Sequence, residues 1–269
     1  MPELSISTWS LHHGLGKAWF DCTPDGYVNR SEQDARLQLL DVPAEISSHG
    51  IHQLEICHFH FPATDSEYIS RLRNELDQHG VSLFSILIDA WDITNPDEAQ
   101  READLSNIRK WIDIASECGA SNARVVAGES EVGQEAINLS AQNLLALAEY
   151  AGERGVRVMT ENFKRLTQRA DPVVEIMEKC DGKIGLCTDF GNFKGEHKLA
   201  DLAKVLPYAD SIHTKAEYED GQIQRDLFSA CMDMSREANF SGYYTLIFQD
   251  PGEEWTYLNG LKEEVVPYL

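Results

Sequence analysis

One short phrase recurs along the chain and constrains its fold more than any other feature. A helical pattern ends in glycine, and a short apolar segment follows at once. The clearest copies are HGIHQLEI (49–56), HGVSLFSI (79–86), CGASNARVV (118–126) and RGVRVMTE (154–161). A glycine just past a helix adopts a left-handed backbone conformation that ends the helix. Because the apolar segment is short enough to be a buried strand, the phrase predicts alternating helices and strands.

Four further segments complete the series. Weaker copies are DGKIGLC (181–187) and FSGYYTLIF (240–248), and LSISTW (4–9) and ADSIHT (209–214) supply two more strands. Eight strand–helix units without a break in composition favour a closed (β/α)₈ TIM barrel, made by a single domain over residues 1–269. A doubly wound open sheet is the alternative. Such sheets normally carry a glycine-rich phosphate loop after an early strand, which this sequence lacks.

Local signals add detail to this barrel. The longest connection, about residues 10–35, follows the first strand and contains Trp19, Phe20 and Tyr27. Loops after barrel strands lie on the catalytic face, so this segment is either a lid or an ordered surface loop with packed aromatic side chains. Three helix starts are also predicted, by a capping box at Thr64 and Glu67 and by N-cap–proline pairs at Asn95–Pro96 and Asp171–Pro172.

The charge balance limits the partners of the protein. The chain has 23 Lys+Arg against 45 Asp+Glu, which gives a formal net charge of -22. Such a surface repels phosphate backbones and anionic membranes, so we expect neither nucleic acid nor membrane as a partner. The six cysteines form no CxxC pair, the first residues do not resemble a secretory signal, and no apolar run approaches the roughly 18 residues of a membrane span. These features predict a cytoplasmic protein.

Three polar residues end or nearly end three successive predicted strands: Glu161, Asp189 and His213. Two carboxylates and an imidazole suit a divalent cation, and neighbouring strands would bring them together at one face of the barrel. Each has a plainer interpretation. Glu161 would form a salt bridge to Lys215 or Arg124, Asp189 would cap a turn, and His213 would be a core histidine. His213 and Lys215 are two residues apart, so they share one side of their strand.

Further candidates follow other strands. His58 and His60, in ICHFHFP (56–62), are predicted to share a face and to bind a polyol or transfer a proton; a packed aromatic turn is the alternative. Arg124 would hold a carboxylate or phosphate, or bridge Glu161 or Asp189. After the third strand, Asp89, Trp91 and Asp92 would grip a sugar ring or cap the next turn.

At this level the chain resembles the sugar phosphate isomerase/epimerase family, the xylose isomerase-like TIM barrels that also include endonuclease IV. The resemblance covers nearly the whole chain, and five segments carry it: GIHQLEICH, ARVVAGE, TEN, GLCTDFGN and IHTKAEY. Their order and spacing are specific for the superfamily and carry little information about the substrate.

The resemblance implies a divalent metal, Mn²⁺ or Mg²⁺, held by Glu, Asp, His and Glu on strands five to eight. The first three correspond to Glu161, Asp189 and His213. The fourth position falls near Ile247, and Gln249 could offer an amide oxygen instead. Asn192 stands where many members have histidine. In the family's epimerases two glutamates exchange protons with the substrate, so the missing glutamate favours a reaction with one base.

Together these signals predict a metal-dependent isomerase or epimerase that acts on a small sugar, keto-sugar or polyol-derived carbonyl compound through an enediolate. Glu161 would be ligand or base, with Lys215 or His58 as the acid. The residues expected to position substrate are Trp9, His60, Arg124, Asn162, Lys164 and Asn192.

Two other functions remain open. The first is a lyase or dehydratase, metal-dependent or metal-free, with Lys164 and Lys215 replacing the cation in the metal-free case. The second is a non-catalytic sugar-binding subunit. Repair of DNA is disfavoured by the negative charge of the chain. The resemblance also makes a homodimer an expectation.

Overall fold

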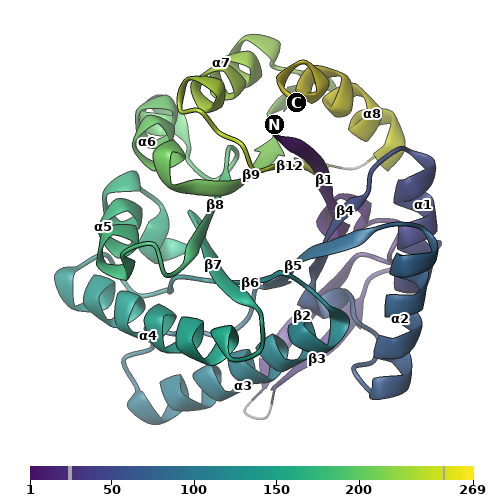
Figure 1. The fold of residues 1–269 in the computed structure, drawn as a ribbon. Coiled ribbons are helices and arrows are strands. Elements are labelled where there is room, and N and C mark those ends of the chain that lie inside the picture. Colours follow the sequence, from purple (N-terminus) through teal and green to yellow (C-terminus); the bar gives the residue numbers. More distant parts are fainter. Residues whose placement is uncertain (24–25, 251) are drawn as a thin grey trace.

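The computed structural model describes the backbone of residues 1–23, 26–250 and 252–269. Eight parallel strands close a barrel in the neighbour order β1, β12, β9, β8, β7, β6, β5 and β4 (Figure 1). The barrel strands are β1 Glu3–Ser7, β4 Gln53–Cys57, β5 Ser82–Ile88, β6 Asn122–Val125, β7 Arg157–Glu161, β8 Gly185–Asp189, β9 Ala209–Lys215 and β12 Tyr243–Ile247. The predicted TIM barrel is therefore confirmed.

Helices ring the outside of the barrel (Figure 1). They are α1 Val42–Ser48, α2 Ser66–Gln78, α3 Glu98–Cys118, α4 Gln134–Gly152, α5 Ala170–Cys180, α6 Lys198–Val205, α7 Arg225–Glu237 and α8 Glu254–Val265. Their apolar faces pack on the outward side chains of the strands, as Leu72 of α2 and Leu144 of α4 show, both fully buried in the main core. Of the described helices, none is long and apolar enough to cross a membrane.

The glycines correctly predicted where helices end, whereas the predicted N-caps are displaced from the residues that cap the helices. Gly119 ends α3 in the left-handed conformation, with φ of 77°. At the start of α3, however, the N-cap is Asp97, whose side chain accepts hydrogen bonds from two backbone N–H groups of the first turn, while Asn95 lies outside the helix. Asp65 likewise replaces Thr64 as the cap of α2. The pair Asp171–Pro172 lies inside the first turn of α5, where proline is tolerated.

The long connection after β1 forms a β-hairpin rather than a loop. Its strands are β2 Ala18–Thr23 and β3 Gly26–Ser31, which pair antiparallel. The ring of Phe20 packs against Phe59, with centroids 5.3 Å apart, so the hairpin is attached to the mouth of the barrel. The side chain of Tyr27 lies outside the described residues. Motion of this hairpin as a lid stays a prediction.

Strand register determines which side chains reach the barrel mouth together. Glu161 is the last residue of β7 and Asp189 the last of β8, and β9 lies beside β8. Asp189 pairs with His213, and Glu161 pairs with Cys187, which lies two residues before Asp189 and shares its orientation. Adjacent strands with this register bring the three polar strand-end residues to one corner of the mouth.

Candidate active site

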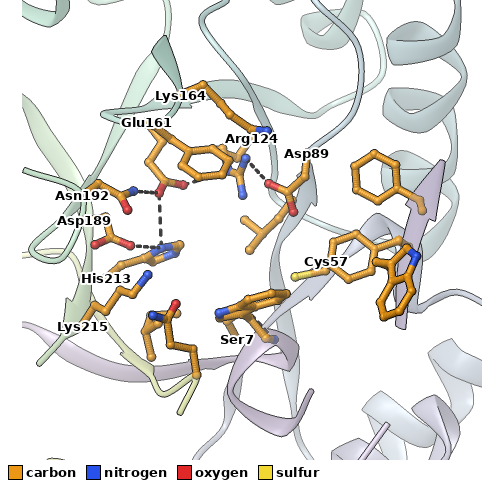
Figure 2. Close-up of a pocket in the computed structure, with 18 residues that line it drawn as sticks. Ser7, Cys57, Asp89, Arg124, Glu161, Lys164, Asp189, Asn192, His213 and Lys215 are labelled. Carbon is orange, nitrogen blue, oxygen red and sulfur yellow. Dashed lines mark hydrogen bonds and ion pairs between the residues drawn. The ribbon is translucent and has the colours of Figure 1, made fainter. Parts of the chain in front are cut away.

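A pocket of about 300 Å³ opens at the carboxyl ends of the strands. Strands β7, β8 and β9 contribute Glu161, Asp189, His213 and Lys215 to its polar wall (Figure 2). In TIM barrels this face carries the active site, because the loops after the strands vary without disturbing the core. The pocket is therefore the natural candidate for the functional site.

His213 lies between the two strand-end carboxylates. Its Nδ1 is 3.8 Å from Oε1 of Glu161 and 3.6 Å from Oδ2 of Asp189. All three residues are at most 4% exposed. A buried cluster of this kind is costly unless its charges are compensated by one another or by a bound cation.

Glu55 orients the imidazole from below. Its Oε2 lies 2.7 Å from Nε2 of His213, and Glu55 is only 1% exposed. An Nε2–H that donates to this carboxylate leaves the Nδ1 lone pair facing Glu161 and Asp189, which is the arrangement of a metal-binding histidine. Glu55 is not among the predicted site residues, although its sequence context carries a signal: it is a carboxylate flanked by Leu54 and Ile56, both of which pack in the main core.

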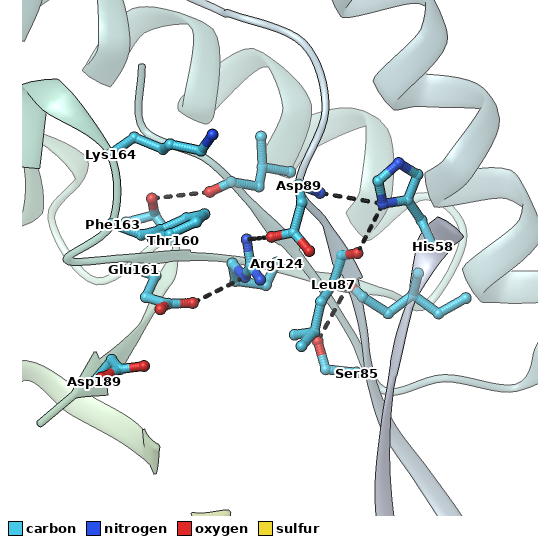
Figure 3. A network of polar contacts seen from close by, with 12 residues as sticks. His58, Ser85, Leu87, Asp89, Arg124, Thr160, Glu161, Phe163, Lys164 and Asp189 are labelled. Carbon is cyan, nitrogen blue, oxygen red and sulfur yellow. Dashed lines mark hydrogen bonds and ion pairs between the residues drawn. The ribbon is translucent and has the colours of Figure 1, made fainter. Parts of the chain in front are cut away.

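Arg124 lies between the carboxylates of Asp89 and Glu161 (Figure 3). Its Nη1 is 2.7 Å from Oδ1 of Asp89, and its Nε is 3.1 Å from Oε2 of Glu161. Neither contact has hydrogen-bond geometry, so they are ion pairs and the donors of the guanidinium are not fully used. The plainer of the two predictions for Arg124, a bridge to Glu161, describes this contact.

Glu161 and Asp189 are held by neutral groups as well. The Asn192 Nδ2 donates to Oε1 of Glu161 at 2.8 Å, and the backbone N–H of Gly191 donates to Oδ1 of Asp189 at 2.5 Å. The second contact is the turn cap expected as the plainer role of Asp189. Gly191 also makes room for Lys215, because a Cβ at this glycine would lie 2.5 Å from Cδ of the lysine.

The environment shifts the pKa values of the cluster in different directions. Burial raises the pKa of Glu161, against the opposing charges of Arg124 and His213. Burial also acts to raise the pKa of Asp189, but contacts with His213, Lys215 and Gly191 outweigh it, so this pKa is lowered. A carboxylate with a raised pKa beside one with a lowered pKa is the usual distinction between a proton-transferring group and a permanent anion.

The predicted site residues His58 and His60 do not line the pocket. Strand β4 ends at Cys57, and a 3₁₀ turn over His58–His60 follows, so strand alternation stops and the two histidines do not share a face. The Nδ1 of His58 is 3.3 Å from the backbone O of Leu87 and 3.3 Å from the N of Asp89, while Nδ1 of His60 is 2.8 Å from Oγ1 of Thr8. His58 is fully buried and its ring packs against Trp111. The predicted packed aromatic turn therefore describes this segment better than a catalytic acid.

Asn162 also differs from its predicted role as a substrate ligand. Its Nδ2 donates to the backbone O of Asp189, at 3.0 Å, and its Oδ1 accepts from the backbone N–H of Asp189, at 2.7 Å. Through these two hydrogen bonds the side-chain amide of Asn162 joins the end of β7 to the end of β8. Asn162 thus positions Asp189 and does not line the pocket.

The remaining predicted residues surround the mouth. Trp9, Lys164, Asn192 and Gln249 line the pocket. Lys164 is paired with Glu129, whose Oε1 lies 3.3 Å from Nζ. Gln249 follows β12 and is exposed, and Ile247 of β12 also lines the pocket, at the position where the resemblance implies a glutamate. Metal binding by Gln249 stays a prediction.

Comparison with known proteins decides the family. Residues 43–252 match the model of the xylose isomerase-like TIM barrel family. The chain belongs to this family. No curated protein sequence matches this xylose isomerase-like barrel significantly.

Solved structures share its fold at low sequence identity. The IolI protein with a bound zinc atom has a TM-score of 0.72 at 15% identity, covering 99% of this chain and 97% of its own. The D-allulose 3-epimerase from Methylomonas sp. has a TM-score of 0.70 at 14% identity, covering 100% and 98%. A xylose isomerase-like barrel from Mycobacterium smegmatis in complex with magnesium has a TM-score of 0.68 at 16% identity, covering 99% and 96%.

The residues of this xylose isomerase-like barrel fit a divalent metal. The Oε2 of Glu161 is buried and accepts no hydrogen bond from any described residue. Four carboxylates, from Glu55, Asp89, Glu161 and Asp189, meet two permanent cations, Arg124 and Lys215. A metal-binding imidazole is neutral, so with His213 as a ligand two negative charges remain, and a divalent cation would neutralise them.

A thiol lies close to the same corner. Ligand atoms of Glu161, Cys187 and His213 all lie within 4.8 Å of one another, which makes them a second possible ligand set. Cys187 packs with Phe84 and Met159 beneath the pocket, and burial raises the pKa of its thiol to about 11. Mn²⁺ and Mg²⁺ prefer oxygen and nitrogen donors to thiolate, so Glu161, Asp189 and His213 are the favoured set for these ions.

Proposed function

We propose that this chain is an isomerase that moves a carbonyl group along a small sugar or keto-sugar by proton transfer, with a divalent Mn²⁺ or Mg²⁺ ion. One observation carries the proposal. Glu161 is a buried carboxylate with a raised pKa, it faces the pocket, and its Oε2 accepts no hydrogen bond from a described residue. A base with a pKa moved toward neutrality is suited to removing a proton from a carbon acid.

The proton route needs only residues of the pocket. Glu161 takes the proton from the carbon beside the carbonyl, and the electron pair of the broken C–H bond forms the C=C bond of an enediolate. Lys215 donates a proton to the carbonyl oxygen and recovers one from the neighbouring hydroxyl group. Glu161 then returns its proton to the former carbonyl carbon, which exchanges aldose and ketose without net gain or loss.

Glu161, Asp189 and His213 would hold a divalent cation, which when bound would supply positive charge that stabilises the oxyanion. Arg124 keeps one oxygen of Glu161 in place, and Asn192 the other. Trp9 supplies a ring face at the pocket wall on which the carbon skeleton of a sugar can stack.

The side chains that the eighth barrel strand presents to the pocket favour isomerisation over epimerisation. A two-base epimerase needs a second carboxylate across the substrate from the first. Strand β12 presents Ile247 to the pocket, and its continuation presents Gln249. Neither side chain accepts a proton from carbon at neutral pH.

The same observation supports a lyase as the second candidate. Elimination of water also uses one base, with an acid that protonates the leaving hydroxyl group. Glu161 and Lys215 could serve in those roles without a second carboxylate. Product analysis separates the two reactions, because dehydration lowers the mass of the sugar by one water and isomerisation leaves the mass unchanged.

The test is turnover of a panel of aldoses, ketoses and keto-sugars in the presence of Mn²⁺ or Mg²⁺, read by chromatography and mass. We expect an isomeric product from at least one sugar, and Glu161→Gln is expected to lower the rate by roughly 10²- to 10⁴-fold, the usual contribution of a general base. Glu153→Gln is the matched control, because that side chain is 74% exposed.

Two results would contradict the proposal. Undiminished turnover by Glu161→Gln would remove the base from its role. Binding of a sugar without any product, in protein carrying the metal, would favour the non-catalytic sugar-binding subunit instead.

A further inference from the structure

The pocket has two chemically different halves. Figure 2 shows Glu161, Asp189 and Lys215 on one side and Cys57 across the cavity from them. The half around Cys57 is apolar, and its lining residues are Trp9, Trp19, Phe20, Cys57, Phe59 and Leu87. A substrate that fills the pocket therefore meets charged groups at one end and hydrocarbon at the other.

The apolar half is a continuous, preformed surface. Cys57, Phe59 and Leu87 form a small buried cluster separate from the main core, and Trp9 and Phe20 are partly buried against it. The centroid of Phe59 lies 6.2 Å from that of Trp9 and 5.3 Å from that of Phe20. These contacts join the turn after β1, the turn after β4 and the hairpin β2–β3 into one aromatic strip.

The strip has more aromatic side chains than the stacking of one sugar ring needs. Trp19, beside Phe20 on the hairpin, lines the pocket and is 38% exposed, so it is among the few large hydrophobic residues described that are exposed. One aromatic ring is enough to stack a sugar, and Trp9 already provides it. Phe20 and Trp19 add further apolar surface to the pocket, and covering this surface with a ligand is favourable.

We propose that the substrate is a keto-sugar that carries an apolar group away from its carbonyl, such as the aryl or alkyl aglycone of a keto-glycoside, and that this group lies along Phe59, Phe20 and Trp19. This inference rests on the proposed function for the polar end. The sugar part meets Glu161, Asn192 and Lys215, while the apolar part lies under the hairpin. Bulk hydrophobic contact supplies affinity there, and the few polar groups at the other end supply orientation.

The test is isothermal titration calorimetry with two probes that share one sugar, methyl β-D-glucopyranoside and phenyl β-D-glucopyranoside. We expect the phenyl compound to bind on the order of tenfold more tightly, since a buried phenyl ring removes apolar area from water at both surfaces. The proposal further requires a more negative heat-capacity change for the phenyl compound, the mark of apolar burial.

Variants of the hairpin locate the effect. Phe20→Ala and Trp19→Ala should each reduce the advantage of the phenyl compound and leave binding of the methyl compound nearly unchanged. Val132→Ala is the control, because Val132 is a hydrophobic side chain that is 54% exposed and does not line the pocket. Trp19 is exposed enough that its loss should leave folding intact.

The outcomes distinguish this inference from the proposed function. Equal affinity for the two glucosides, or no binding of either, overturns the apolar subsite. If an unsubstituted keto-sugar is isomerised in that case, the proposed function stands alone. If the phenyl preference appears but no sugar of any kind is converted, the subsite stands and the proposed function fails.

Discussion

At the scale of single residues, the cluster depends on a carboxylate that touches no substrate. Glu55 lies beneath His213 and accepts from the imidazole nitrogen that faces away from Glu161. It is a positioning residue, because it acts through the orientation and basicity of His213. Its removal should therefore weaken metal binding rather than block the pocket.

Glu55→Gln tests this role. We expect the affinity for Mn²⁺ to fall by roughly 10- to 100-fold, the usual cost of losing a carboxylate behind a metal-binding histidine. Isothermal titration of the metal-free protein with Mn²⁺ measures it, with Glu153→Gln as the control. An unchanged dissociation constant would show that His213 needs no such partner.

A second prediction concerns His58, whose pKa is lowered from 6.5 to about 4, chiefly by burial. In the unfolded chain the imidazole takes up a proton near pH 6.5, whereas in the folded protein it stays neutral to about pH 4. Its contribution to stability is therefore complete above pH 6.5 and is lost as the pH falls.

As the pH falls from 6.5 to about 4, this histidine should therefore lower the free energy of unfolding by up to about 1.4 kcal/mol for each pH unit. Chemical denaturation between pH 6.5 and about 4 measures the slope of the unfolding free energy against pH. His58→Gln, which keeps polar atoms in the site, should make this slope shallower. A variant with the same slope as the natural protein would mean that His58 is already protonated when folded.

At the scale of elements, the alternation of helix, glycine and strand was sufficient to predict the barrel, because each left-handed glycine is a local requirement of the backbone. The corner formed by Glu161, Asp189 and His213 was predictable for a similar reason: side-chain orientation in a strand alternates strictly. Prediction failed where strands end. The 3₁₀ turn after Cys57 redirects His58 and His60, and nothing in ICHFHFP indicates that turn.

Caps were the other local error, and they lead to a test. Asp97 caps α3 by accepting hydrogen bonds from the N–H groups of Ala99, at 2.9 Å, and Gln100, at 3.1 Å. Asp97→Ala should lower the free energy of unfolding by about 1 kcal/mol without changing the pocket. Asn95→Ala, measured alongside by thermal or urea denaturation, should cost less. Equal losses would mean that Asn95 shares the cap.

At the scale of the whole molecule, a bound metal would couple the site to stability. The corner of Glu161, Asp189 and His213 joins three adjacent strands, so a cation held there stabilises the folded barrel over the unfolded chain. When no cation is bound, the excess negative charge of this corner destabilises the barrel.

Adding Mn²⁺ to protein treated with a chelator should therefore raise the thermal midpoint. At a hundredfold excess over the dissociation constant, we expect an increase of roughly 5–10 °C. Differential scanning fluorimetry measures the shift, and His213→Ala should abolish most of it. A shift that persists in His213→Ala would place the ion elsewhere on this acidic protein.

The central claim is that Glu161 removes a proton from the carbon next to a sugar carbonyl. Incubation of the metal-loaded protein with the keto-sugar panel in deuterium oxide, followed by NMR, tests it most directly, because exchange is visible even where net conversion is small. The account predicts deuterium at the carbon beside the carbonyl of at least one sugar, and none with Glu161→Gln. Equal incorporation by that variant, or no incorporation in any sugar, would contradict it.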